Sequence, residues 1–285
     1  MKISLHPARM NAGSLSLAEF VDLAARHDFD AVEFSVGAAR KLIEEKGSPD
    51  RVKAQLAEKG VELGSFGLST EWRKDDATFR EGLAKLDDEA AVAASLGANR
   101  CTTWMPPAVN EDPDAWTERT ADRFREIARV FGKYGVRLGL EWVGPHHLRA
   151  GGANAMGATN AIYTLPGTLE LIERIGEPNV GLLVDSYHCY TTGVTESDLA
   201  KLTDAQIVHV HINDAAKGVG VAGAKDGERV LAGEGEIDLA GFLNGLRAAG
   251  YKGYIAPEIL SPNNIADDPE TAAARVRASL KSVGL

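Results

Sequence analysis

The sequence contains little cysteine: Cys101 and Cys189 are the only two among 285 residues. Two cysteines are too few for the disulfide framework of a small secreted domain, and disulfides are rare in reducing compartments. A chain of this length buries most of the surface that its unfolded state exposes, so it needs neither a disulfide nor a metal to stay folded. We therefore expect two reduced thiols.

Long hydrophobic runs are also missing. No segment approaches the about 20 consecutive apolar residues that a membrane-spanning helix needs. The first residues, Met1–Pro7, contain no apolar stretch of signal-peptide length. We expect a cytoplasmic location and no membrane partner.

Positive charge is scarce. Lysine and arginine total 31 against 41 aspartate and glutamate residues, and the formal net charge is −10. Proteins that bind the phosphate backbone of nucleic acids need a concentrated basic surface, so we expect no nucleic-acid partner. No Gly-x-Gly-x-x-Gly turn follows the first apolar run, and dinucleotide binding therefore has no support either.

Short β-rich runs alternate along the chain with longer segments of helical periodicity, which is typical of βαβ units. Eight runs are predicted to be strands: Ile3–His6, Ala31–Phe34, Glu62–Leu68, Arg100–Trp104, Arg137–Trp142, Val180–Asp185, Ile207–Ile212 and Tyr254–Ile259. Helices are predicted between and after them: Leu17–His27, Pro49–Lys59, Ala77–Leu96, Asp114–Tyr134, Thr168–Ile175, Leu239–Ala249 and Pro269–Ser282. The pattern predicts an α/β fold, a single (β/α)8 TIM barrel over residues 1–285, with an open doubly wound sheet as the alternative.

Four consecutive predicted strands carry, at their last or next-to-last position, a side chain that can bind a metal, namely Glu141, Asp185, His211 and Glu258. In a barrel the carboxyl ends of the strands form one rim, so these residues should converge there. Each alone is more typical of a helix cap or an ion pair. Together, three carboxylates and one imidazole suit Mn²⁺, Mg²⁺ or Co²⁺ better than a structural zinc, and a cation would offset the repulsion between the carboxylates.

Three segments, Val208–Asp214, Gly233–Asp238 and Gly250–Glu258, resemble the xylose isomerase-like barrel superfamily. That group includes sugar-phosphate isomerases and epimerases, inosose-processing enzymes, hydroxypyruvate isomerases and ketose 3-epimerases. The resemblance is sharpest over Leu138–Glu258 and is more specific for the superfamily than for any one member. It assigns the role of metal ligands to the four strand-end residues.

The resemblance implies a metal-dependent isomerase or epimerase of a small ketose, sugar phosphate or inosose. A proton next to a carbonyl would be removed through a metal-stabilised enediolate, with Glu141 and Glu258 as base and acid in an order that the sequence leaves open. The expected cofactor is one divalent ion, Mn²⁺ first, with Mg²⁺, Co²⁺ or Zn²⁺ as alternatives. The expected partner is a small carbohydrate, and a homo-oligomer stays open.

Six further residues are candidates to contact the substrate: His188, Arg229, Trp104, Trp142, His6 and His147. His188 closes an Asp-x-x-His pattern of the resembled family, and Arg229 precedes its Gly-x-Gly-x-Ile-Asp segment. Each has an ordinary structural alternative, such as packing for a tryptophan or solvation for a loop charge. Glu33 lies in the second predicted strand and could also reach the pocket.

Two long irregular stretches, Val143–Pro166 and Asn213–Ile237, follow the fifth and seventh predicted strands. Loops of this length in a compact domain are usually lids or binding loops. The second lacks a compact glycine-rich turn into a helix, so a mobile lid is favoured over a phosphate site.

Three other functions follow from the same residues. Deprotonation next to a 3-keto group of a glycoside could expel a substituent, which would make the protein a lyase. A non-catalytic sugar-binding barrel is an alternative of another class. An abasic-site endonuclease is disfavoured, because the chain is acidic and has only seven histidines.

Overall fold

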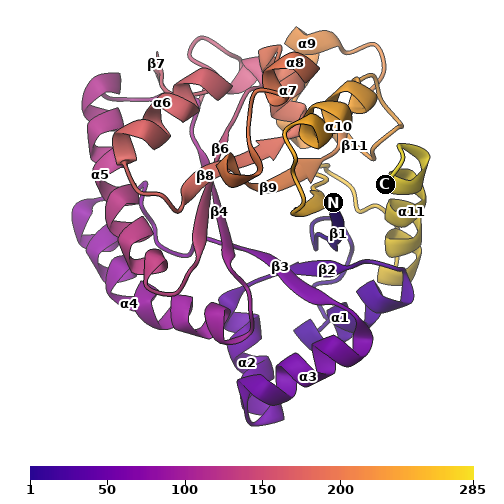
Figure 1. The fold of residues 1–285 in the computed structure, drawn as a ribbon. Coiled ribbons are helices and arrows are strands. Elements are labelled where there is room, and N and C mark those ends of the chain that lie inside the picture. The colour runs from indigo at the N-terminus through magenta and orange to yellow at the C-terminus, as the bar shows by residue number, and fades with distance from the viewer.

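The computed structural model describes all 285 residues and contains a closed barrel of eight parallel strands (Figure 1). The barrel strands are β1 (Lys2–Leu5), β2 (Ala31–Phe34), β3 (Glu62–Gly67), β4 (Arg100–Met105), β6 (Arg137–Trp142), β8 (Val180–Asp185), β9 (Ile207–Ile212) and β12 (Tyr254–Pro257). They are hydrogen-bonded in chain order, and β1 pairs with β12 to close the ring. The predicted barrel is confirmed, and the open sheet is excluded.

Helices surround the barrel on its outside (Figure 1). The helices are α1 (Leu17–Arg26), α2 (Val36–Lys46), α3 (Pro49–Lys59), α4 (Asp76–Ser95), α5 (Pro113–Gly132), α6 (Leu165–Ile175), α7 (Ser186–Thr192), α8 (Glu196–Leu199), α9 (Gly220–Gly223), α10 (Leu239–Ala248) and α11 (Pro269–Ser282). The sequence did not predict α2, α7, α8 or α9. At the start of α1, Ser16 and Glu19 form the reciprocal cap that the sequence indicates.

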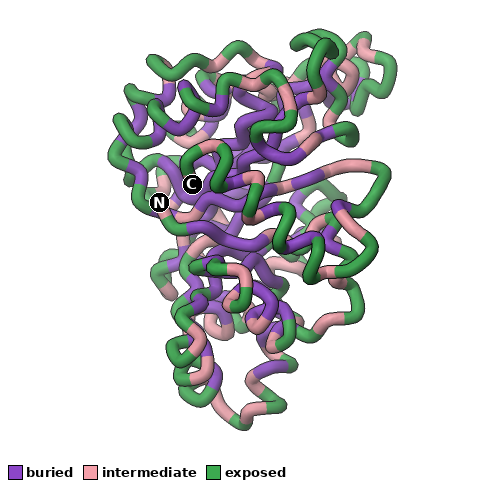
Figure 2. The backbone as a smooth tube through the Cα atoms, turned by 90° about the vertical axis from the view of Figure 1, so that its right-hand side faces the viewer, coloured by how far each residue is buried: buried purple, intermediate pink, exposed green.

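The hydrophobic core lies inside the barrel and between the strands and the helices. Figure 2 shows the buried backbone concentrated in the strands and the exposed backbone in the outer turns. Buried apolar side chains from Ile3 to Leu280 form one continuous cluster, so strands and helices share a single core. No helix combines the length and the apolar composition needed to cross a membrane.

The two long loops are less irregular than predicted. One contains η1 (His146–Leu148) and β7 (Thr159–Asn160), which pairs antiparallel with β5 (Ala108–Val109). The other contains α9, η3 (Asp226–Glu228) and an antiparallel pair. This pair joins β10 (Asp214–Ala215) to β11 (Arg229–Val230). A further 3-10 turn, η2 (Asp204–Gln206), precedes β9.

The loop after β9 is fastened to the barrel by one carboxylate. Buried Asp214 accepts hydrogen bonds from the backbone N–H groups of Gly233, Gly235 and Ile237, at 2.9–3.1 Å. Position 235 must be glycine, because a Cβ there would lie 2.0 Å from the carbonyl oxygen of Ala215. This anchoring sets the path of the segment that carries Arg229.

Candidate metal centre

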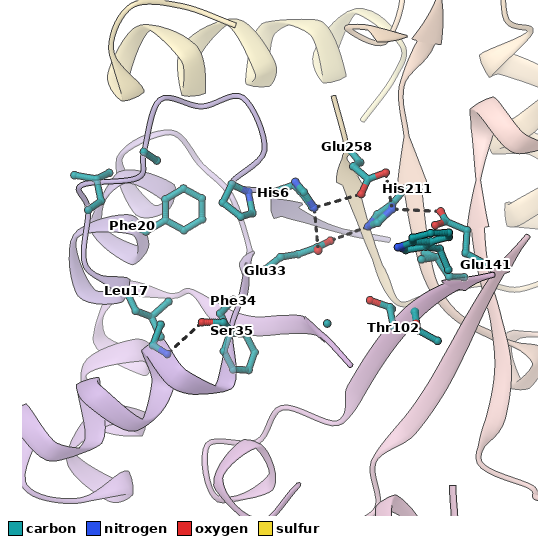
Figure 3. Close-up of a pocket in the computed structure, with 18 of the residues that line it drawn as sticks. His6, Leu17, Phe20, Glu33, Phe34, Ser35, Thr102, Glu141, His211 and Glu258 are labelled. Carbon is teal, nitrogen blue, oxygen red and sulfur yellow. Dashed lines mark hydrogen bonds and ion pairs between the residues drawn. The ribbon is translucent and has the colours of Figure 1, made fainter. Parts of the chain in front are cut away.

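The four predicted ligands meet at the carboxyl end of the barrel. Glu141, Asp185 and His211 lie at or near the ends of β6, β8 and β9, and Glu258 directly follows β12. One oxygen or nitrogen from each side chain lies within 4.8 Å of the others. Figure 3 shows Glu141, His211 and Glu258 pointing toward one another. The structure thus brings together residues that are 117 positions apart (258 − 141) in the sequence.

Two atoms that face this cluster have no hydrogen-bond partner. They are Glu141 Oε1 and His211 Nδ1, both buried. The two atoms are 3.7 Å apart, and His211 Nδ1 is 3.5 Å from Glu258 Oε2, too far for good hydrogen bonds. Buried polar atoms without partners are costly. A divalent cation would satisfy both atoms, so the donor set fits such an ion.

The orientation of the His211 ring is set by Glu33 on β2. Glu33 Oε1 lies 3.2 Å from His211 Nε2 and 2.6 Å from His209 Nε2. A proton on Nε2 of His211 is therefore held by the carboxylate, which leaves the lone pair of Nδ1 facing the cluster. This carboxylate–histidine arrangement is typical of histidines that bind metals. His209, on the same face of β9 as His211, was not singled out from the sequence.

The pKa values of the two glutamates in the cluster, Glu141 and Glu258, are shifted in opposite directions. Burial, together with the charges of Glu258 and Asp185, raises the pKa of Glu141. Burial alone would also raise the pKa of Glu258, but the charges of His211 and Arg229 outweigh it and hold that pKa below its ordinary value. The surroundings thus move the two pKa values apart, as in acid–base pairs.

Arg229 is a buried cation beside the cluster. Its Nη1 donates to Asp185 Oδ2 at 2.9 Å and to Glu258 Oε2 at 2.8 Å, and its Nη2 donates to Asp226 Oδ1 at 2.7 Å. The guanidinium side chain is only 1% exposed. It offsets the carboxylate charge rather than reaching freely toward solvent. Asp226 was not predicted to belong to the site.

His188 and Trp142 pack together on the outer side of the cluster. His188 Nδ1 accepts a hydrogen bond from the Gly144 N–H at 3.3 Å, and its Nε2 lies 3.9 Å from Glu141 Oε1. Trp142 is fully buried, and its indole Nε1 lies 3.4 Å from the carbonyl oxygen of His188. Since Glu141 points into the barrel, the next side chain on the strand points outward. The structure therefore places Trp142 under α7 and not in a cavity.

A cavity of about 460 Å³ opens beside the cluster. His6, Glu33, Glu141, His211 and Glu258 line its inner end, and Trp104 lies at its edge with 40% of its surface exposed. The guanidinium of Arg73 stacks on Trp104 at 4.0 Å. His147 lies outside the cavity lining, in η1, which contacts α9 of the other long loop.

Comparison with families and structures gives consistent results. A family model described as "Xylose isomerase-like TIM barrel" matches residues 21–283. The structure of a xylose isomerase domain protein from Alicyclobacillus acidocaldarius is 35% identical, with a TM-score of 0.87, and the match covers 99% of this chain and 98% of that one. The structure of IOLI protein with a binding zinc atom superposes with a TM-score of 0.78 at 19% identity, over 99% of this chain and 98% of that one.

Two kinds of curated relative carry different activities. An inosose isomerase of Halalkalibacterium halodurans is 29% identical over 66% of this chain and 63% of its own length. A 3-dehydroshikimate dehydratase of Pseudomonas aeruginosa is 26% identical over 86% of this chain but only 36% of its own length. The chain thus spans less than two thirds of either relative, and the activity of neither whole protein transfers directly.

Proposed function

The chain belongs to the xylose isomerase-like TIM barrel family, and from this premise we propose that it is a metal-dependent isomerase or epimerase of a small carbohydrate. The observation that carries the proposal is the convergence of Glu141, Asp185, His211 and Glu258, with two buried atoms lacking partners. The inosose isomerase relative and the zinc-bound neighbour support it.

The proposed cofactor is one divalent ion, with Mn²⁺ as the first to test. When bound, such an ion supplies Lewis acidity that makes a C–H bond next to a carbonyl more acidic. Glu33 holds His211 in the orientation that presents Nδ1 to the ion. Arg229 donates hydrogen bonds to Asp185 and Glu258, and its charge, together with that of His211, holds the pKa of Glu258 below its ordinary value despite burial.

Proton transfer is assigned to Glu141 and Glu258. They stand on β6 and at the end of β12, which are separated around the barrel by β8 and β9. Their carboxylates therefore approach a bound substrate from different sides. One removes the proton next to the carbonyl, and the other returns a proton to a different face or carbon of the enediolate. His6, which lines the cavity, is proposed to contact a substrate oxygen. His188, predicted from the sequence to do the same, is buried outside the cavity lining, with its Nε2 3.3 Å from Arg229 Nη2.

A lyase is the second candidate, favoured by the dehydratase relative. The first step is the same removal of a proton next to a ketone. In a 3-keto-glycoside the electron pair of the broken C–H bond then forms a carbon–carbon double bond to the anomeric carbon. The bond from that carbon to the aglycone oxygen breaks, and the departing oxygen keeps the electron pair and takes up a proton.

The test uses metal-stripped protein in D₂O, with Mn²⁺ added back, offered free ketoses, ketose phosphates, inososes and 3-keto-glycosides. The expected result is deuterium beside a carbonyl, seen by NMR, that depends on metal and disappears in Glu258→Gln. Metal binding by that variant is measured first, so that loss of proton transfer is distinguished from loss of the ion. Glu58→Gln is the control, since Glu58 lies exposed on α3.

Absence of exchange on every substrate, with metal bound, would contradict the proposal. The structure of the product distinguishes the two candidates: a rearranged or epimerised sugar supports the isomerase, and a released aglycone supports the lyase.

A further inference from the structure

The cavity beside the cluster has two chemically different ends. The inner end is lined by carboxylates and histidines, and the outer end by an apolar wall that we define as Leu15, Leu17, Phe20 and Phe34. Figure 3 shows Leu17, Phe20 and Phe34 on the opposite side of the cavity from Glu141 and Glu258. A ligand that fills the cavity therefore meets both surfaces at once.

The apolar wall is held in place by the fold. Leu17 and Phe20 belong to α1, and Phe34 ends β2, where its ring packs against Phe66 with the centroids 5.7 Å apart. Leu17, Phe20 and Phe34 are each at most 8% exposed. Leu17, Phe20 and Phe34 thus belong to the hydrophobic core and present its surface to the cavity, and the half-buried Leu15 packs against them at the edge.

No lysine or arginine lines this cavity. The Arg229 guanidinium is engaged by Asp185, Asp226 and Glu258. At the start of α1, the Ser16 N–H and hydroxyl already donate to Glu19. With the ketone at the proposed metal ion, a phosphate group at the outer end would lie against the apolar wall without a cation, and burying an unpaired charge is very costly.

A fully hydroxylated free ketose also fits poorly. The hydroxyls of Ser16 and Ser35, which also line the cavity, already cap α1 and α2. Hydroxyl groups of a sugar against Leu17, Phe20 and Phe34 would therefore give up hydrogen bonds to water without a replacement. The room for a ligand extends beyond the metal end of the first cavity. A second cavity of about 350 Å³ adjoins it, lined by residues at the starts of α1 and α2, and shares Leu15 and Leu17 with the first. Lys41 lines only this second cavity, which Glu45 also lines.

We propose that the substrate is an uncharged sugar ketone with an aromatic substituent, such as a 3-keto-glucoside with an aryl aglycone. The sugar lies at the metal cluster, and the aromatic ring lies against the apolar wall, Leu15 included. This inference rests on the proposed function and favours its lyase form. It assigns the apolar wall as the part of the site that determines specificity.

The experiment compares phenyl and methyl 3-keto-β-D-glucoside, and a ketose phosphate, as substrates in the metal-dependent deuterium exchange. Unreactive phenyl and methyl β-D-glucosides are compared by calorimetry on the Mn²⁺-loaded protein. Burying an aromatic ring favours the phenyl compounds by about tenfold to hundredfold in both assays.

Leu15→Ser is the main variant, because Leu15 is half-buried in the loop before α1 and its change does not open the core. Phe20→Ala is the second. Both are expected to lose most of the preference for phenyl while binding Mn²⁺ as the wild type does. Leu169→Ser, at a half-buried position on α6, is the matched control and keeps the preference.

Equal affinity for phenyl and methyl compounds, or a preference for the ketose phosphate, would overturn the inference. If free ketoses exchange and no aryl preference is seen, the proposed function stands and the inference fails. If the phenyl glucoside binds with a preference that Leu15→Ser abolishes, but no ketone exchanges, the specificity assignment stands and the proposed chemistry fails.

Discussion

Replacing Glu33 by glutamine tests how the fold prepares His211 for a metal. Glu33 Oε1 accepts from His209 Nε2 at 2.6 Å and from His211 Nε2 at 3.2 Å. Glutamine has nearly the same shape, so it leaves no void, but it is neutral and its amide can turn either its oxygen or its NH₂ group toward the histidines. The His211 ring then loses the group that holds its proton on Nε2.

The expected loss in metal affinity is about 10–100-fold, as for other carboxylates that support a metal-binding histidine. This corresponds to about 1.4–2.8 kcal/mol, since each 1.4 kcal/mol is a factor of ten. Glu33 is 9% exposed, so solvent screens the interaction little.

The assay is calorimetric titration of metal-stripped protein with Mn²⁺ at pH 7.5, alongside Glu58→Gln as the control. Thermal melting of both variants without metal shows whether the fold is intact. An affinity for Mn²⁺ within about twofold of the wild type, in a folded Glu33→Gln protein, would refute the role of Glu33 in orienting His211.

Three further predictions concern pH, the loop after β9 and the core. Burial alone would lower the pKa of His211, but the charges of Glu258 and Glu33 raise it well above its ordinary value, and the pKa of Glu141 is raised too. Metal must therefore displace a proton, and Mn²⁺ affinity should keep rising above pH 7.5 by up to about tenfold per pH unit; a plateau there would contradict this. Asp214→Asn leaves one side-chain oxygen for four backbone N–H donors, those of Ala215, Gly233, Gly235 and Ile237. It should lower the free energy of unfolding in urea by about 1–3 kcal/mol, with faster hydrogen exchange over residues 229–237; unchanged exchange would argue against the anchoring. Phe124→Ala should cost about 3–5 kcal/mol, because Phe124 is fully buried against Trp72 with ring centroids 4.5 Å apart; a loss below about 1 kcal/mol in the same assay would contradict tight packing there.

Much of the barrel could be predicted from the sequence, because strands and helices repeat with distinct periods and helix ends carry recognisable caps. All eight strands lie within two residues of their predicted bounds. The gathering of Glu141, Asp185, His211 and Glu258 also follows from topology, since the carboxyl ends of parallel strands share one rim. Helix α2 was missed, as its short apolar stripe of Val36, Ala39 and Leu42 immediately follows β2.

Side-chain placement was harder to predict. Trp142 was predicted to contact substrate, although alternation along β6 points it away from Glu141. The same alternation places His209 on the face of His211 and could have identified it. Glu33 is different: β2 is four residues long, buried throughout, and its register with β3 shifts between Val32 and Glu33. No periodic pattern shows which way Glu33 points.

The pairing of Arg229 with Asp226 could not be predicted either. Both lie in or beside the 3-10 turn η3, and their position depends on the anchoring of the loop by Asp214. Contacts of this kind depend on the path of a loop, and the spacing of residues in the sequence does not determine that path.

The most direct test of the account is anomalous X-ray diffraction from crystals of the protein soaked with Mn²⁺. The account predicts one anomalous peak per chain, bounded by Glu141, Asp185, His211 Nδ1 and Glu258. A second set of side chains, His6, Glu33 and His211, could also hold an ion. A peak at that second set, with none among the four strand-end residues, would contradict the proposed metal centre.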